Sequence, residues 1–424
     1  ILFMSGVCSR SAVWPAWVLC GLVLVVDFGR AHNRYLVHEN YVNKYETNPV
    51  VDVLRDRPYE NRVKLYPVQD AANLAQSELA LLQQQQQDTN RTDQAQIQIK
   101  IKDLVQKFQQ VQLFSSVYLG LWAQHHFPFY RVQSTDRIQE PRVAADNRVY
   151  REALYMNELR LCELTSTKYL LGLRKGDASY LDVFYGEEGA FKERMLFSLV
   201  PKAPDREVRT VEDITVITLT NGALALIEFN NALPRAGLFV NWRSGLSDQE
   251  VLTTLPQKTW SPRQEVLISE EIPGPEVNDS NATVVAASYT DYDPKRIVLS
   301  TEAETSTVLL LNDKYHPAWK VAVDNKPAKL LRANYLMRAV HLPAGKHEVE
   351  FRFVPSEASI RVSMAGFGLG ALAILVLLFL PRPETTGPLD DPGNSKGENI
   401  SSPDEPTEPS PRKSQSRSGR RKRR

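Results

Sequence analysis

The sequence predicts a membrane-anchored α+β protein: a β-rich extracytoplasmic domain with a helical insertion, ending in a β-sandwich-like meander and flanked by transmembrane helices. Residues 362–380 form a run of nineteen residues without a charge, long enough for a helix to cross a bilayer. Val349, Phe351 and Phe353 alternate with charged neighbours, the period-two pattern of a half-buried strand. Residues 67–122 are rich in Gln, Ala and Leu, which favours helices.

A second apolar segment, residues 1–28, is interpreted as a transmembrane helix at the end of a longer membrane region. Trp14 and Trp17 stand at one end of it, where aromatic residues gather at a membrane interface. The alternative is a signal peptide, with Arg10 as its basic region and a cleavage site at Gly29-Arg30-Ala31, where Gly29 and Ala31 are the small residues.

The distribution of charge predicts the topology. Eight Lys and Arg lie in the last thirteen residues, so the rest of the chain sums to −7 (+1 − 8). Because Lys and Arg concentrate on the cytoplasmic side, we expect the tail inside and residues 30–360 outside. The basic run lacks aromatic residues and has no accompanying reading module, which argues against a nucleic-acid partner.

Composition divides the chain between and beyond these spans. In the α+β part, Asn221 and Gly222 predict a turn between two alternating runs. The last segment is Pro, Ser and charge, and cannot bury enough apolar surface to order itself. The predicted segments are an extended or mixed stretch (29–66), a Gln-rich helical segment (67–122), an α+β extracytoplasmic domain (123–296), a C-terminal β-meander (297–358) and a disordered basic cytoplasmic tail (381–424).

No sequence motif identifies a catalytic centre. Cys162 is alone in the body, so no disulfide is expected there, and no Cys–His spacing suggests zinc. The chain has no Gly-rich phosphate loop, nucleophile elbow or HExxH motif. We therefore assign no metal, no cofactor and no catalytic residue from the sequence.

The densest group of polar side chains is "QHHFPFYRVQSTD", with His125, His126, Tyr130 and Asp136. General acid–base chemistry or a metal site could be assembled from such residues. Adjacent histidines, however, point in different directions on a helix or a strand, and no carboxylate stands at a ligand spacing on the same face. Lining of a groove, or packing of a loop, is the preferred interpretation.

The aromatic residues Tyr315, Trp319 and Tyr335 gather in the predicted β-meander. Flat aromatic rings can stack on the apolar face of a sugar ring. The alternative, which we favour from the pattern alone, is that these rings belong to the core of the meander.

Several pieces of the C-terminal part occur in an order that resembles the bacterial YfhO-type membrane proteins. They are "YHPAW" at 315–319, "DNK" at 324–326, "RANY" at 332–335 and "PAGKH" at 343–347, followed at once by the apolar run. Weaker similarity in "TSTKYLLGL" and "ALPRAGLFV" extends the resemblance over residues 12–380. Two residues depart from the pattern, Ala318 and Asn325, each in place of Gly; Asn tolerates positive φ, so the turn should survive.

The resemblance implies a glycosyltransferase of the multi-span GT-C kind that uses a polyprenyl-phosphate sugar and acts on cell-envelope polymers in the bacterial cell membrane. In that family the acidic catalytic residues lie in an early extracytoplasmic loop between N-terminal membrane helices. We expect them in a separate or missing N-terminal region, so whether this chain is itself an enzyme is left open. The alternative is a non-catalytic, membrane-anchored envelope assembly or glycan-binding protein.

The same resemblance suggests a contact surface for the glycan or the lipid-linked donor. An outer domain of such a protein needs sugar contacts, and Tyr315, Trp319, Arg332 and Tyr335 combine aromatic faces with a fixed cation. The planar guanidinium of Arg332 would pair with a phosphate or orient a hydroxyl. The alternative for Arg332 is a surface ion pair.

Overall fold

The computed structural model divides the chain into two units, Ile1–Ser356 and Glu357–Arg424. The predicted disordered tail and the first twelve residues of the N-terminal apolar segment lie outside the described residues. The residues that the structure describes are 13–33, 35–36, 40–65, 77–86, 91–136, 142–174, 189–205 and 207–379.

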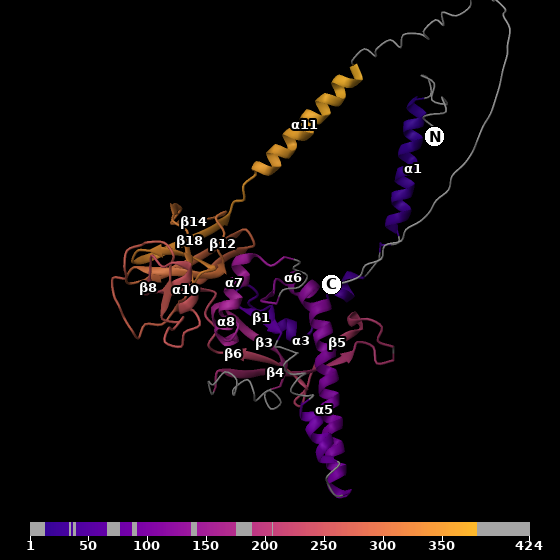
Figure 1. Cartoon of the computed structure of the whole chain (residues 1–424), viewed down its shortest axis with the longest axis vertical. Coiled ribbons are helices and arrows are strands. Elements are labelled where there is room, and N and C mark those ends of the chain that lie inside the picture. The colour runs from indigo at the N-terminus through magenta and orange to yellow at the C-terminus, as the bar shows by residue number, and fades with distance from the viewer. Residues whose placement is uncertain are drawn as a thin grey trace, which may run out of the picture. The chain divides into compact units, whose positions relative to one another are not determined.

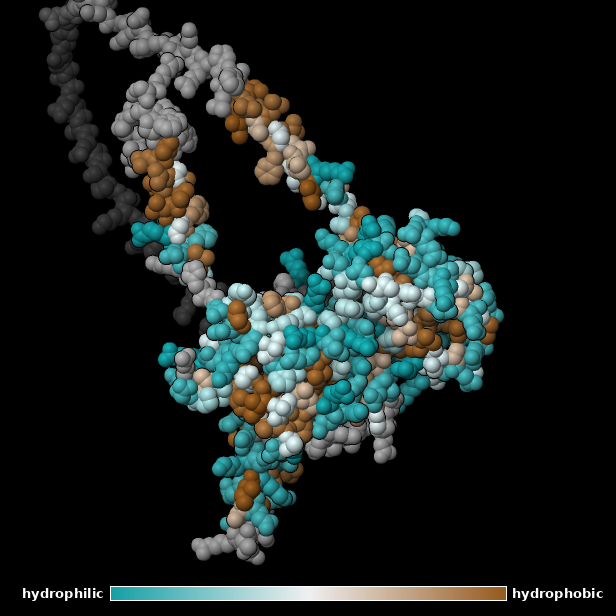
Figure 2. All heavy atoms as spheres, turned by 180° about the vertical axis from the view of Figure 1, so that it is seen from behind, coloured by the Kyte–Doolittle hydropathy of each residue, from teal (hydrophilic) through white to brown (hydrophobic). Residues whose placement is uncertain are grey.

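The second unit contains the helix α11 (Ala358–Phe379). In the described part of the chain, α11 is the one helix long and apolar enough to cross a membrane, over Ala358–Val376. Figure 2 shows hydrophobic atoms over much of its length. The first apolar segment also forms a helix, α1 (Val13–Asn33), with exposed apolar side chains such as Leu22 and Val25. That α1 is a second, flanking span stays a prediction.

A six-stranded mixed sheet organises the N-terminal half of the body. Its order is β2-β1-β3-β6-β4-β5; β1 pairs in parallel with β2 and β3, and the other pairs are antiparallel. The strands are β1 (Arg62–Leu65), β2 (Gln133–Ser134), β3 (Thr167–Leu173), β4 (Phe191–Pro201), β5 (Ile214–Thr218) and β6 (Leu224–Phe229).

The structure has the predicted turn at Asn221 and Gly222, but the strands on either side of it do not pair with each other. The runs become β5 and β6, and each pairs with β4 on opposite sides instead of with the other. A Cβ on Gly222 would lie 2.5 Å from the carbonyl oxygen of Phe197, so the loop passes close over β4. Glycine is required here by close backbone approach.

Helices cover one face of this sheet (Figure 1). Phe114, Tyr118, Trp122 and Phe127 from this layer are buried against β4, β5 and β6. Asn48 caps one helix by accepting hydrogen bonds from the backbone N–H groups of two residues that follow it. The elements are α2 (Tyr41–Lys44), α3 (Pro49–Leu54), α5 (Arg91–Val117), the π-helix η1 (Tyr118–His126), α6 (Phe127–Phe129) and the short 3-10 helix η2 (Val211–Asp213).

The Gln-rich segment is helical, as predicted, wherever the structure describes it, at 77–86 and 91–122. The helix does not end at 122, because α5 continues through η1 to α6. In α5 the buried side chains are Val111, Phe114 and Val117, all in its C-terminal part. This end of α5 is therefore the part that packs on the sheet.

Two further sheets, each with five antiparallel strands, build the C-terminal half of the body. Their orders are β10-β7-β13-β17-β16 and β11-β12-β18-β14-β15. The strands of the first sheet are β7 (Ala236–Phe239), β10 (Val285–Ala286), β13 (Thr307–Lys314), β16 (Leu331–Ala333) and β17 (Met337–Leu342). Those of the second are β11 (Ser288–Asp293), β12 (Arg296–Ala303), β14 (Trp319–Val323), β15 (Lys326–Ala328) and β18 (Gly345–Phe353).

The two sheets share one hydrophobic core. Leu309 and Val340 of the first sheet meet Leu299, Val349 and Phe351 of the second. Val349 and Phe351 point inward and Glu348 and Arg352 outward, as the alternation predicts. The strands do not form one meander, however, because the chain switches sheets between β12 and β13 and again before β14, β16 and β18.

The opposite face of the first sheet carries another core, formed with helices. Tyr150, Leu161, Trp242 and Val251 pack there with Leu310 of β13. The elements on this side are α7 (Ala145–Ala153), α8 (Glu158–Leu164), α10 (Asp248–Thr254) and the short parallel pair β8 (Asn241–Arg243) and β9 (Glu265–Leu267). The first C-terminal sheet is thus covered on both faces.

The β14–β15 hairpin confirms that the turn survives without glycine. Asp324 and Asn325 have φ values of 50° and 63°, and Val323 pairs with Lys326 across them. Positive φ at both central residues is the requirement of the two-residue turn that matches strand twist. The Asp324 carboxylate also accepts a hydrogen bond from the backbone N–H of Glu348, which ties the turn to β18.

We expect Phe351→Ala to lower the free energy of unfolding by about 3–5 kcal/mol, because this fully buried ring fills the core between the two sheets. Arg352→Ala, on the outward face of the same strand, is the control and should change it by less than about 0.5 kcal/mol. Thermal and urea unfolding of the purified chain measure both. Equal stability of Phe351→Ala and the wild type would show that the inward face of β18 is assigned wrongly.

Candidate functional site

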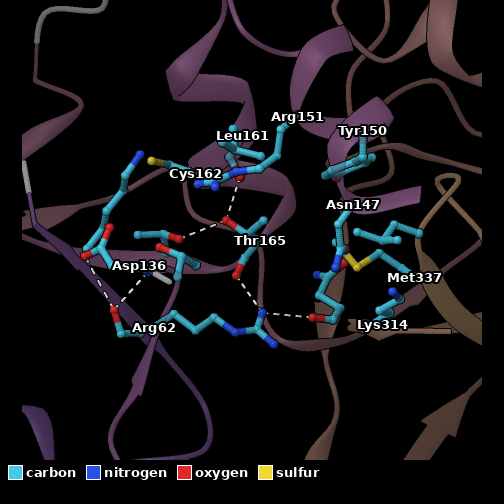
Figure 3. A pocket seen from close by; sticks show the side chains of 16 residues that line it. Arg62, Asp136, Asn147, Tyr150, Arg151, Leu161, Cys162, Thr165, Lys314 and Met337 are labelled. Carbon is cyan, nitrogen blue, oxygen red and sulfur yellow. Dashed lines mark hydrogen bonds between the residues drawn. The ribbon is translucent and has the colours of Figure 1, made fainter. Parts of the chain in front are cut away.

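A polar pocket of about 220 Å³ lies where the mixed sheet meets the first C-terminal sheet (Figure 3). Arg62 and Lys64 reach it from β1, and Asp136 from the segment just after β2. Tyr150 and Arg151 come from α7. Cys162 of α8 and Lys314 at the end of β13 also line the pocket.

Behind the pocket, the carboxylate of Asp313 binds three arginines. Its Oδ1 lies 2.6 Å from Nη2 of Arg62 and 2.8 Å from Nη2 of Arg235, and its Oδ2 lies 2.9 Å from Nη2 of Arg338. Burial by itself would raise the pKa of Asp313, but the charges of Arg235, Arg62 and Arg338 outweigh it and hold the pKa well below the ordinary value. Asp313 is therefore ionised at neutral pH.

This cluster carries two more positive than negative charges, because three guanidinium groups share one carboxylate. Nε and Nη1 of Arg338 are buried and have no hydrogen-bond partner among the described residues. The guanidinium carbon of Arg338 instead lies 3.7 Å from the ring centroid of Trp319, a cation–π contact. Arg62 also donates hydrogen bonds to the carbonyl oxygens of Thr165 and Asn312, at 2.7 and 2.8 Å.

Two hydroxyl groups in the pocket wall are buried and unpaired. Oη of Tyr150 and Oγ1 of Thr135 have no partner among the described residues, although Tyr150 is only 1% exposed. Burial raises the pKa of Tyr150, so its phenol stays protonated and can donate a hydrogen bond. Buried polar groups without a partner are uncommon, and they are consistent with a ligand or water in the pocket.

The other cations of the pocket differ in how they are paired. Lys64 pairs with Glu158, and Lys314 lies 2.9 Å from Asp146. Arg151 makes no ion pair in the part of the chain that the structure describes, and its side chain is exposed at the pocket. Among the described residues, no carboxylate has to leave Arg151 before an incoming anion can bind it.

The structure places Asp136, one of the four predicted groove residues, in this pocket. Its Oδ2 accepts hydrogen bonds from the backbone N–H of Leu65 at 2.6 Å and from Oη of Tyr118 at 2.7 Å. Burial, followed by the charge of Asp136, raises the pKa of Tyr118 well above its ordinary value. Asp136 therefore links β1 to η1 through these two hydrogen bonds. It also lines the pocket.

The other three predicted groove residues are not among those that line this pocket. Nε2 of His126 lies 2.6 Å from the carbonyl oxygen of Lys44, and Tyr130 donates to the carbonyl oxygen of Tyr45. Burial lowers the pKa of His126, so the ring is neutral near pH 7. His125 is half-buried. These contacts fit the packing of a loop, and the described residues contain no group of three metal-binding side chains.

The four predicted contact residues separate into two pairs. Tyr315 and Trp319 line a second pocket of about 590 Å³ beside β14 and β15. Tyr335 lies in the core on the opposite face of the first C-terminal sheet, where its ring stacks on Tyr150. Arg332 joins Tyr335, with its guanidinium 4.5 Å from that ring centroid and Nη1 2.8 Å from Asp248. The four residues do not border one surface.

Sequence reasoning did not select the cations of the first pocket. The signal for Arg62 and Lys64 was their alternation with Val63 and Leu65, which predicts a charged and an apolar face on a strand. Nothing in the sequence indicates that this charged face meets Lys314, 250 positions later. Tyr150 and Arg151 lie on a helix whose pattern gives no sign of a ligand.

Comparison with known proteins identifies the C-terminal β-unit. Residues 279–362 match the family described as "Bacterial membrane protein YfhO", which confirms the resemblance over the C-terminal portion. In this portion the chain is similar to the YfhO-type membrane proteins. The weaker similarity at 165–173 and 232–240 lies outside the matched residues.

No curated protein matches the chain. Among solved structures, it is similar to the arabinofuranosyltransferase AftD from Mycobacteria, determined by cryo-electron microscopy, with 16% identity and a TM-score of 0.19. The similarity covers 41% of this chain and 12% of that one. At this TM-score the likeness carries no argument about fold or activity.

We expect Asp313→Asn to destabilise the protein by about 3–5 kcal/mol at pH 7, because three arginines would lose their buried counter-charge. The depressed pKa of Asp313 means that its contribution is complete above the unfolded pKa of about 4 and is lost as the pH falls below it. The difference between wild type and variant should therefore narrow between pH 5 and pH 3. Urea unfolding at both pH values measures it, and a constant difference would contradict this account.

Proposed function

We propose that this chain is the extracytoplasmic body and closing membrane segment of a YfhO-like protein that takes part in glycosyl transfer. The sugar would come from a polyprenyl-phosphate donor and go to a cell-envelope polymer. The observation that carries the proposal is that the family match, residues 279–362, runs directly into α11, whose apolar stretch can cross a membrane. A β-unit joined so closely to a span works at the membrane surface, where a lipid-linked donor and an envelope acceptor meet.

Within this proposal the body binds glycan, and the catalytic carboxylates belong to a further membrane region. The polar pocket supports binding because its wall combines hydrogen-bond donors, cations and the ring of Tyr150. Tyr315 and Trp319, in their separate pocket, supply aromatic faces on which a sugar can stack. Arg332 and Tyr335 lie at the opposite face of the first C-terminal sheet. There the guanidinium of Arg332 would contact a phosphate or a hydroxyl group of the ligand.

Arg332→Ala tests the role of this cation. We expect lower envelope glycosylation in a strain complemented with the full-length protein, at wild-type protein level. Asp248→Ala is the matched control, because it removes the same ion pair and leaves the guanidinium in place. Glycosylation is measured as the sugar content of purified envelope polymer.

A loss with Arg332→Ala but not with Asp248→Ala supports contact with donor or acceptor. An equal loss with both variants assigns Arg332 a structural role. Normal glycosylation with Arg332→Ala would remove Arg332 from the proposed contact surface.

The proposal also predicts that Cys162 lies outside the bacterial cell membrane and the basic tail inside. In a variant with Cys8 and Cys20 replaced by Ser, a membrane-impermeant thiol reagent should label Cys162 in intact spheroplasts after mild unfolding. Mild unfolding is needed because Cys162 is buried and burial raises the pKa of its thiol to about 11. Labelling only after lysis would reverse the orientation.

A further inference from the structure

We propose that the polar pocket between Arg62, Tyr150, Arg151 and Lys314 binds a single sugar residue that carries a carboxylate. This inference names the ligand class of the glycan-binding site and rests on the proposed function.

The charge of the site selects an anion. Behind the wall, Asp313 neutralises one of three arginines, and Arg62 is the member of that cluster that lines the pocket. Lys64 and Lys314 are each paired with one carboxylate, and Arg151 with none in the described residues. Asp136 adds one negative charge to the lining, so the pocket and the Asp313 cluster behind it together keep a positive excess. An anion held between Arg151 and Arg62 would compensate charge that the described part of the protein leaves unbalanced.

The remaining lining groups suit the ring and hydroxyls of a sugar. Tyr150 and Thr135 offer buried hydroxyls that have no partner among the described residues, and Asn147 adds an amide to the lining. Leu161 and Met337 add apolar surface for the faces of a ring. The volume of about 220 Å³ is below the roughly 300–1,000 Å³ of sites for drug-sized ligands, so the pocket fits one sugar unit.

The number of unpaired cations distinguishes a carboxylate from a phosphate monoester. Arg151 is a single guanidinium at the opening, and a guanidinium fork matches the two oxygens of one carboxylate. A phosphate monoester carries about −1.5 to −2 charges at pH 7 and would need Lys64 or Lys314 to leave its present carboxylate partner. Arg235 and Arg338, which carry the excess charge of the Asp313 cluster, do not line the pocket, so the lining itself favours a single negative charge on the sugar.

The test measures binding of three probes to the purified full chain in detergent: D-glucuronate, D-glucose and D-glucose 1-phosphate. Saturation-transfer NMR and titration give the dissociation constants at pH 7. We expect glucuronate to bind at least about tenfold more tightly than either other probe, the effect of one charged hydrogen bond.

Variants on α7 assign the contacts. Arg151→Gln should remove the preference for glucuronate over glucose. Tyr150→Phe should weaken both probes, and it should fold because the lost hydroxyl has no partner. Arg148→Gln is the control, since Arg148 lies on the same helix, exposed and paired with Glu152, and is not among the pocket residues.

Equal binding of glucose and glucuronate, tighter binding of glucose 1-phosphate, or no binding of any probe would overturn the inference. So would retention of the glucuronate preference in Arg151→Gln. These outcomes are separate from the proposed glycosyl transfer, which is tested at Arg332 in cells. If the protein supports glycosylation in cells but does not bind glucuronate, only the proposed ligand class is wrong.

Discussion

The ionised carboxylate of Asp313 is the interaction on which the arrangement of the body depends. It joins Arg62 of the mixed sheet to Arg235, just before β7, and to Arg338 of β17. Three buried guanidinium groups would repel one another without it, since a buried charge that has lost its partner is costly. The carboxylate therefore holds together two sheets that are distant in sequence, and the polar pocket lies at the junction that it fastens.

The same cluster connects the polar pocket with the aromatic side of the C-terminal unit. Arg62 lines the pocket. Arg338 makes a cation–π contact with Trp319, whose ring packs against the core between the two C-terminal sheets. Both guanidinium groups share the carboxylate of Asp313, so a change in charge at one is felt at the other. The YfhO-type β-unit, through Asp313 and Lys314, contributes to a site whose other wall comes from strands and helices outside the matched segment.

Covering both faces of the first C-terminal sheet has a direct consequence for function. Side chains alternate along β13 and β17, with Leu309 and Val340 facing the second sheet, and Leu310 and Ala339 facing the helices. Residues that are close in sequence therefore lie on opposite faces of this sheet. Trp319 and Tyr335, sixteen positions apart, belong to opposite sides of the sheet, and a binding surface must be built from more distant parts of the chain.

The sequence alone determined the features that depend on local pattern: the apolar helical run before residue 380, the inward face of β18, the glycine-free turn at Asp324 and Asn325, and the similarity of the C-terminal unit to the YfhO family. Each depends on residues within a few positions of one another, where periodicity and turn preferences act. Only the tertiary structure decided strand pairing and the pocket. Contacts between residues distant in sequence decide whether β5 pairs with β6 or with β4, and whether Arg62 meets Asp313. Such contacts produce no periodic pattern in the sequence from which they could be predicted.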